Sequence, residues 1–151
     1  MKKLIFLALL IVAGCTLNAE QEASLNTAIR TQLKAMNEGQ LMTVISNIHP
    51  SAVRYYMDQG DEAFKSAFEL ADEDGFQPYF QDPTILKSES SKSSLQVKFK
   101  IVRVEDEFFD VNAVDEIYFA ISEDNGKSWH FLKEKDYKNE EIIKASLRLI
   151  N

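Results

Sequence analysis

The pattern of apolar residues along this 151-residue chain predicts an α+β fold. Apolar residues in the first half recur every three or four positions, which places them on one face of a helix. In the second half the period changes to two, as in strands with one buried face. The strands follow one another through short links, so we expect an antiparallel sheet. The sequence thus predicts three N-terminal helices packed on an antiparallel sheet, followed by a short C-terminal helix.

The chain begins with a segment that resembles a bacterial lipoprotein signal. Two lysines precede nine apolar residues, Leu4 to Val12, a core too short to span a bilayer. Val12-Ala13-Gly14-Cys15 is similar to a lipobox, the motif in which the cysteine is acylated and becomes the mature N-terminus. We therefore expect a signal peptide over residues 1–14, a tether over 15–21 and a single domain over 22–151. The alternative is an ordinary secreted protein that is cleaved after Ala19.

Acylation of Cys15 would place the protein in the bacterial cell envelope. Two or more acyl chains give stable attachment to a membrane. Thr16, which is not Asp, favours the outer membrane, with the domain facing the periplasm or the cell surface. No second apolar run of about 18 residues follows, so we expect contact with the membrane through the acyl chains alone.

Charge and composition argue against several classes of function. The net charge of −7 repels phosphate backbones, so we expect no binding to nucleic acid. With Cys15 acylated, no thiol remains for a disulfide, a metal site or a nucleophile. His49 and His130 have no ligand partners at helical or hairpin spacing, so we expect no metal and no cofactor. Calcium binding by the acidic residues 105–107 with Asp110 is the alternative to a solvated loop.

Three helices are expected before the sheet, over residues 22–37, 40–48 and 61–73. Gly39 can take the left-handed conformation that ends the first helix, and His49-Pro50 ends the second. Asp61 and Glu62 suit the positive N-terminus of the third. The segment 51–57 is ambiguous.

Strands are expected over residues 84–88, 95–104, 114–122 and 129–133, and a last helix over 139–149. Centring the second hairpin on the loop Asp106 to Asn112 pairs Phe99 with Phe119 and Arg103 with Asp115. The third hairpin then sets Phe119 against Phe131. This register predicts an aromatic ladder of these three phenylalanines on one face of the sheet.

Residues Ser122 to Trp129 resemble the Asp-box pattern S-x-D-x-G-x-[S/T]-W of sialidase propellers. In such a hairpin turn, Asp124 can accept backbone N–H groups and Gly126 can take a positive φ. A sialidase needs several of these turns and a cluster of arginines, whereas this chain has one turn and four arginines. We therefore expect a structural turn rather than a sialidase site.

The layout as a whole resembles the nuclear transport factor 2-like superfamily. The likeness lies in the first helix ending at Lys34-Ala35-Met36-Asn37-Glu38-Gly39, the second closing at His49-Pro50, and long hairpins that end in Trp129-His130-Phe131. The resemblance implies that three helices cover the concave side of a strongly curved sheet to form a cone. Enzymes of this superfamily place Asp, His or Tyr inside the cone, but a shared fold does not transfer those roles.

The candidate residues for a ligand pocket or its rim are His49, Tyr55, Tyr56, Arg103 and Asp115, and no catalytic residue is assigned. An ion pair between Arg103 and Asp115 would keep the carboxylate charged and make it a poor general base. We therefore expect a non-catalytic envelope lipoprotein that binds a small apolar ligand or a protein partner through the cone or the sheet face. The alternative is a small acid–base enzyme, an isomerase, dehydratase or hydrolase, with its site at the cone mouth.

A homodimer through the sheet face is a further expectation. It rests on a set of outward-facing residues that is more apolar than a free surface requires: Val102, Val104, Tyr118 and Leu132.

Overall fold

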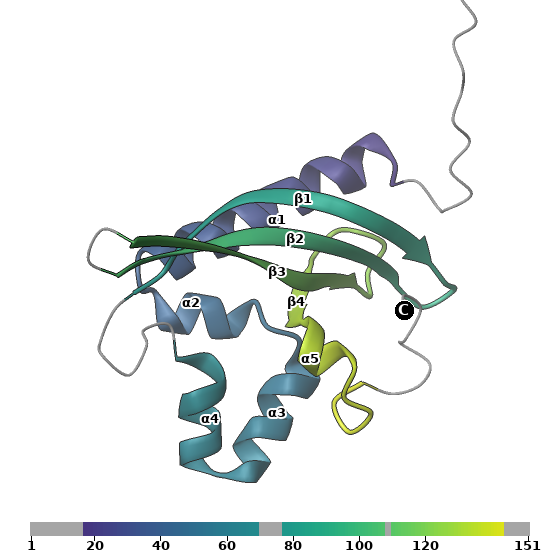
Figure 1. Cartoon of the computed structure of the whole chain (residues 1–151). Coiled ribbons are helices and arrows are strands. Elements are labelled where there is room, and N and C mark those ends of the chain that lie inside the picture. The colour runs from purple at the N-terminus through teal and green to yellow at the C-terminus, as the bar shows by residue number, and fades with distance from the viewer. Residues whose placement is uncertain (1–16, 70–76, 108–109, 144–151) are drawn as a thin grey trace, which may run out of the picture.

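The computed structural model describes residues 17–69, 77–107 and 110–143 and has an α+β fold (Figure 1). Helices precede the strands, and a short helix follows them. The helices before the sheet are α1 (Ala19–Asn37), α2 (Leu41–Ser46), α3 (Pro50–Gln59) and α4 (Asp61–Phe68). The strands are β1 (Tyr79–Ser90), β2 (Leu95–Glu107), β3 (Asp110–Ser122) and β4 (His130–Lys133), and α5 (Glu134–Tyr137) follows directly.

Within the described residues four helices precede the sheet, so the prediction of three is wrong. The additional helix is α3, which includes the ambiguous segment 51–57. Pro50 ends the preceding apolar pattern but also occupies the first turn of α3, where its missing N–H and fixed φ are tolerated. The helix expected over 139–149 is not seen in its described part, where residues 140–142 form a turn. The remainder of that predicted helix lies outside the described residues.

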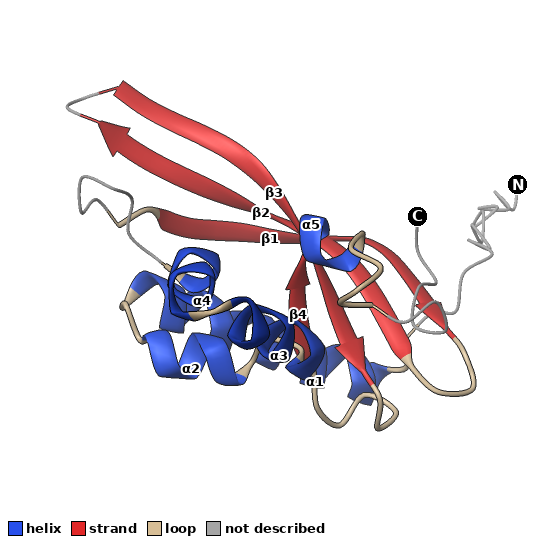
Figure 2. Cartoon of the chain, turned by 90° about the horizontal axis from the view of Figure 1, so that it is seen from below, coloured by secondary structure: helices blue, strands red, loops and turns tan. Residues whose placement is uncertain are grey.

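The four strands form an antiparallel meander in the order β1-β2-β3-β4. Helix α1 packs on the face of the sheet that contains Phe99, and α5 packs on the opposite face through Tyr137 (Figure 2). Helix α3 contacts α5 through a hydrogen bond from Tyr56 to Asp136. The hairpin of β2 and β3 is paired along its whole length, from Leu95 opposite Ser122 to Glu107 opposite Asp110. β4 pairs only with residues Tyr118 to Ile121, so the far half of this hairpin extends beyond β4.

The register of β2 against β3 differs from the predicted one by a single residue. Phe99 lies opposite Tyr118, and Phe119 lies opposite Lys98. Because side chains alternate along a strand, this shift places Phe119 on the other face of the sheet from Phe99. The predicted three-residue aromatic ladder is therefore wrong. Phe99 and Phe131 do share a face, with their ring centroids 5.8 Å apart in an edge-on arrangement.

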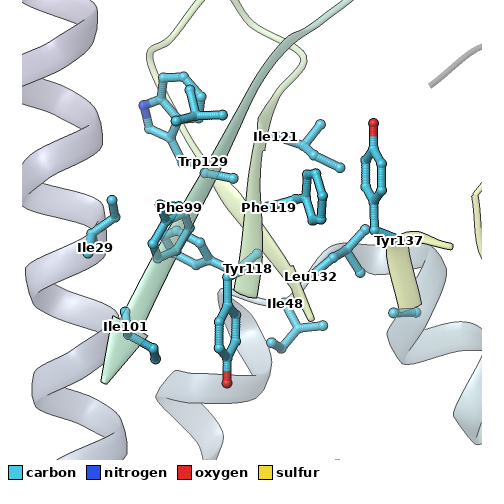
Figure 3. Packing of buried hydrophobic residues seen from close by; sticks show 14 of the residues in the cluster. Ile29, Ile48, Phe99, Ile101, Tyr118, Phe119, Ile121, Trp129, Leu132 and Tyr137 are labelled. Carbon is cyan, nitrogen blue, oxygen red and sulfur yellow. The ribbon is translucent and has the colours of Figure 1, made fainter. Parts of the chain in front are cut away.

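The physical reason for this difference is that the centre of the sheet is buried on both faces. On the face toward α5, Phe119 is 1% exposed and stacks on Tyr137, with ring centroids 3.7 Å apart. The Tyr137 hydroxyl donates to Oε1 of the buried Gln96 at 2.5 Å. Figure 3 shows Phe119 and Tyr137 together on one side of the strands and Phe99 beside Ile29 on the other. A strand covered on both faces has no apolar–polar alternation from which its register could be predicted.

The face toward α1 carries the larger part of the core. Its buried residues come from α1, the α2 region and three strands: Leu25, Ile29, Met36, Val44, Ile48, Val97, Phe99, Ile101, Tyr118 and Phe131. The segment after α2 pairs with β4 like a short extra strand. His49 N–H donates to the Phe131 carbonyl at 3.0 Å, and Phe131 N–H donates to the Asn47 carbonyl at 2.8 Å. These two bonds fix the end of α2 to the sheet.

The turn over Ser122 to Trp129 has the structural role expected of it. Asp124 accepts hydrogen bonds from the N–H groups of Lys127 and Ser128 and from the hydroxyls of Ser122 and Ser128. These bonds lower the pKa of Asp124 below its usual range. Gly126 has a φ of +86°, and a Cβ there would lie 2.6 Å from Cγ of Gln21. Gln21 is part of the α1 capping box and its amide also donates to Asn125, so the turn contacts the start of α1.

Replacement of Phe119 by Ala tests the two-sided burial of β3. We expect Phe119→Ala to lower the free energy of unfolding by about 3–5 kcal/mol, because it leaves a cavity beneath Tyr137. Chemical denaturation measures the change. Val114→Ala on the same strand is the control, since Val114 is 50% exposed and its truncation should cost less than about 1 kcal/mol. Equal effects of the two substitutions would contradict this placement of Phe119.

Candidate ligand cavity

A cavity of about 150 Å³ lies between the helices and the sheet. Its walls come from α1, α2, α4, β1, β2, β3 and β4. The apolar part is lined by Met36, Val44, Ile48, Ala67, Phe68, Pro78 and Phe80. The polar part is lined by Gln32, Glu69, Arg103, Glu105, Glu116, Tyr118 and Lys133. The cavity thus has an apolar wall and a charged end.

The alternation of side chains along β2 places the cavity at the edge of the core. Val97, Phe99 and Ile101 are buried against the helices, and the same face continues with Arg103 and Glu105. This face therefore changes from apolar to charged along one strand. The cavity lies at that change, where the packed core gives way to ion pairs.

The side chain of Asn37, at the end of α1, positions Phe80 in the cavity wall. Its amide donates to the Phe80 carbonyl at 2.9 Å and accepts from the Phe80 N–H at 2.7 Å. One side chain thus satisfies both backbone groups of Phe80 and holds β1 against α1.

Arg103 is at the centre of the charged end. Its Nη1 donates to Glu116 Oε1 at 2.9 Å, and its Nη2 forms an ion pair with Glu105. The Tyr118 hydroxyl donates to the other carboxylate oxygen of Glu116 at 3.0 Å. Burial, and then the nearby Glu116, raises the pKa of Tyr118 well above its usual value, so this hydroxyl keeps its proton and remains a donor. Both carboxylates are therefore engaged by neighbouring donors.

Lys133, the last residue of β4, is partly buried and lines the same end of the cavity. Its ammonium group makes no hydrogen bond or ion pair with any residue in the described part of the chain. Burial lowers the pKa of Lys133, and the charge of Glu116 acts in the opposite direction. Lys133 is therefore a cavity cation with no partner among the described residues, whereas Arg103 has two partners and leaves only its buried Nε unpaired.

Of the predicted pocket residues, Arg103 lines this cavity and Asp115 does not. Asp115 lies opposite Val102, on the other face of the sheet, and pairs with Lys100 at 2.8 Å. The predicted pair of Arg103 and Asp115 is therefore wrong, and Glu116 is the partner of Arg103. The one-residue shift of register explains why Glu116, and not the adjacent Asp115, is the partner of Arg103.

Tyr55 and Tyr56 lie on α3 and do not appear among the residues that line the cavity. The Tyr56 hydroxyl donates to Asp136 Oδ1 at 2.6 Å, and burial together with this bond raises the pKa of Tyr56. The Tyr56 ring also packs edge-on against Phe68, with ring centroids 5.5 Å apart. Tyr56 therefore links α3 to α5 and to α4.

His49 is the N-cap residue of α3 and is buried. Its Nδ1 accepts from the Ser51 N–H at 3.3 Å and lies 2.6 Å from the Ser51 hydroxyl. Its Nε2 has no hydrogen-bond partner in the described chain, and the nearest carboxylate is that of Glu123 at 3.9 Å. Burial lowers the pKa of His49. The charge of Glu123 acts in the opposite direction, and that of His130 lowers the pKa a little further. His49 thus acts as a neutral cap.

The sequence pattern did not indicate that Glu105, Glu116, Tyr118 and Lys133 line a cavity. Side chains along β4 point alternately to the two faces of the sheet. Lys133 is two positions after Phe131 and therefore lies on the same face. That alternation could have indicated Lys133. Asp115 and Glu116 are adjacent in the sequence and lie on opposite faces of the sheet. Only the correct register shows that Glu116 is the one on the same face as Arg103.

Several further expectations can be compared with the described part of the chain. No group of three or more His, Cys, Asp or Glu side chains there could hold a metal ion. No helix within it is long and apolar enough to cross a membrane. The lipidation candidate Cys15 lies outside the described residues. Comparison with protein-family models, curated protein sequences and solved structures finds no match to this chain.

The lowered pKa of His49 predicts a specific pH dependence of stability. Above pH 6.5 the histidine is neutral in both the folded and the unfolded chain, so it contributes nothing. As the pH falls through 6.5, the unfolded chain takes up a proton that the folded chain resists, and the folded state loses stability. We expect a loss of up to about 1 kcal/mol per pH unit from this residue between pH 6.5 and 5. His49→Asn, which keeps a capping acceptor, should reduce the slope of unfolding free energy against pH.

An NMR titration provides a direct check. The ring protons of His49 should titrate with a midpoint below 6.5, and a midpoint above it would contradict the argument.

Proposed function

We propose that this protein is a non-catalytic, lipid-anchored module of the bacterial cell envelope that binds a small, largely apolar ligand in the cavity between its helices and its sheet. The observation that carries this proposal is the cavity itself. About half a dozen apolar side chains from α1, α2, α4 and β1 form its wall, and its charged residues gather at one end. Ligand sites in proteins commonly combine apolar walls with a few polar groups that fix orientation.

The volume of the cavity limits the size of the ligand. Drug-sized ligands occupy pockets of roughly 300–1,000 Å³, whereas this cavity has about 150 Å³. An apolar cavity of about this size accommodates a molecule such as benzene. We therefore propose a ligand with one aromatic ring or a short alkyl chain rather than a lipid or a peptide.

An acid–base enzyme is the alternative, and it would need a proton-transfer group within reach of the cavity. Of the three carboxylates that line the cavity, Glu105 and Glu116 are both bound to Arg103, and Glu116 also accepts from Tyr118. The third, Glu69, is exposed to water after the end of α4. His49 does not line the cavity and acts as a helix cap. The arrangement therefore supports binding more than catalysis.

The sheet-face homodimer has less support than the cavity. Of the four residues expected to form one outward face, Leu132 is fully buried and Tyr118 lies on the face toward the helices. Val102 remains on the opposite face, between the charged neighbours Lys100 and Asp115. A protein partner on this face is thus not part of the proposal.

Membership of the nuclear transport factor 2-like superfamily, with its cone-shaped enclosure, is likewise a proposal. Helices that precede an antiparallel meander and cover one of its faces support it. The position of Phe119 on the face away from those helices removes one of the arguments for it.

Filling the cavity tests the proposed binding. Val44→Phe adds an aromatic ring to the apolar wall, and Met42→Phe adds the same ring to the surface of the same helix, where Met42 is 78% exposed. We expect native mass spectrometry of the full-length chain, extracted from membranes, to show a bound small molecule in the parent protein and in Met42→Phe. Val44→Phe should lose it while remaining folded by circular dichroism. Retention of the molecule in a folded Val44→Phe would rule out the cavity as its site.

The proposed anchor has its own test. Mass spectrometry of the mature N-terminus should show a di- or triacylated Cys15, and Cys15→Ser should release the protein from the membrane fraction. An unmodified chain that begins at Glu20 would indicate an ordinary secreted protein.

A further inference from the structure

The charged end of the cavity offers one accessible donor group, the Lys133 ammonium, that described residues leave unused. Nε of Arg103 also has no partner, but it is buried and a molecule in the cavity does not reach it. Lys133 lines the cavity from the end of β4, on the same strand face as the buried Phe131. The Lys133 ammonium group has three N–H donors and no acceptor capacity. None of these donors has a partner in the described chain, although the side chain is partly buried. The Nζ atom is not among the fully buried atoms, so water reaches it, and a bound acceptor would take the place of that water.

The other hydrogen-bonding groups of β2 and β3 at this end are engaged with one another, and the exposed Glu69 carries no donor when ionised. Arg103 is bound to Glu105 and Glu116, and Tyr118 donates its hydroxyl proton to Glu116. A ligand that competed for Arg103 would have to break an ion pair between partly buried groups. A ligand can therefore contact Lys133 without breaking an ion pair.

The charges around Lys133 decide between an anionic and a neutral ligand. Two cations, Arg103 and Lys133, and three acids, Glu69, Glu105 and Glu116, line the cavity. Glu116 lies close enough to Lys133 to influence its titration more than any other charge does. An anion bound to Lys133 would therefore also lie near the Glu116 carboxylate, and like charges in a poorly solvated site repel strongly. An uncharged oxygen accepts the same hydrogen bond without this repulsion.

We infer that the ligand is an uncharged molecule with one oxygen acceptor of the carbonyl type, held by Lys133, and an apolar body of about benzene size against Val44, Ile48 and Phe68. This inference rests on the proposed function, because it names the chemistry of the molecule that would occupy the same cavity. Lys133 determines the orientation of the ligand, and the apolar wall supplies most of its burial. The class comprises small ketones, esters and amides.

Three probes of similar shape test the inference: toluene has no acceptor, acetophenone has a neutral carbonyl, and benzoate has an anionic carboxylate. Dissociation constants are measured by NMR titration of the full-length chain in one detergent, so that partition of a probe into micelles cancels between variants. The variants are Lys133→Met, which keeps an unbranched apolar side chain and removes the donor, and Lys135→Met, which alters an exposed lysine two residues away.

We expect the parent protein and Lys135→Met to bind acetophenone at least about tenfold more tightly than toluene, as a hydrogen bond to a charged donor implies. Lys133→Met should lose this preference and keep its affinity for toluene. Benzoate should bind more weakly than acetophenone to every variant.

Two groups of outcomes overturn different claims. Toluene binding without a preference for acetophenone, or a preference that survives in Lys133→Met, overturns the inference and leaves the proposed cavity function intact. Tighter binding of benzoate than of acetophenone overturns the claim of a neutral ligand. Binding of none of the three probes to the parent protein, together with no co-purifying molecule, overturns the proposed function itself.

Discussion

Burial of β3 on both faces is the constraint from which the rest of the structure follows. Tyr118 and Phe119 are neighbours in the sequence, and each is almost fully buried on an opposite face of the sheet. Tyr118 packs beside Phe99 under the helices, whereas Phe119 stacks on Tyr137. This strand thus requires a layer on each side, and α1 with α2 and the short segment around α5 provide those two layers.

Hydrogen bonds near the cavity join the helices to one another and to the sheet. Gln32 donates to the Val44 carbonyl at 3.4 Å and accepts from Asn47 at 2.9 Å, which joins α1 to α2 and to the residue that follows α2. Asn37 joins α1 to β1 through Phe80. The side chains of Met36, Val44 and Phe80 do not fill the space between these hydrogen bonds, and the cavity remains. The cavity is therefore a consequence of how the helical layer is attached.

Much of the fold could be predicted from the sequence, because most of its elements have one buried face. The period of 3.6 predicted α1 and α2, and the period of two predicted all four strands, although β1 begins at Tyr79 rather than at the predicted Thr84. The register of β3 could not be predicted in this way. Residues Ile117 to Ile121 are apolar almost without interruption, since both faces are covered, and such a run fits two registers equally well. That single ambiguity assigned the partner of Arg103 to Asp115 in place of Glu116.

The same ambiguity explains why the candidate site was predicted only in part. Arg103 was identified from its position on β2, where alternation is clear, while its acidic partner depended on the register of β3. Lys133 follows the buried Phe131 and Leu132 at the end of a four-residue strand, and its neighbour Phe131 is held by backbone bonds to residues 47 and 49. A lysine at that position must direct its stem along the covered face of the sheet. Its ammonium group then lies at the charged end of the cavity, where a polar ligand group would find a donor.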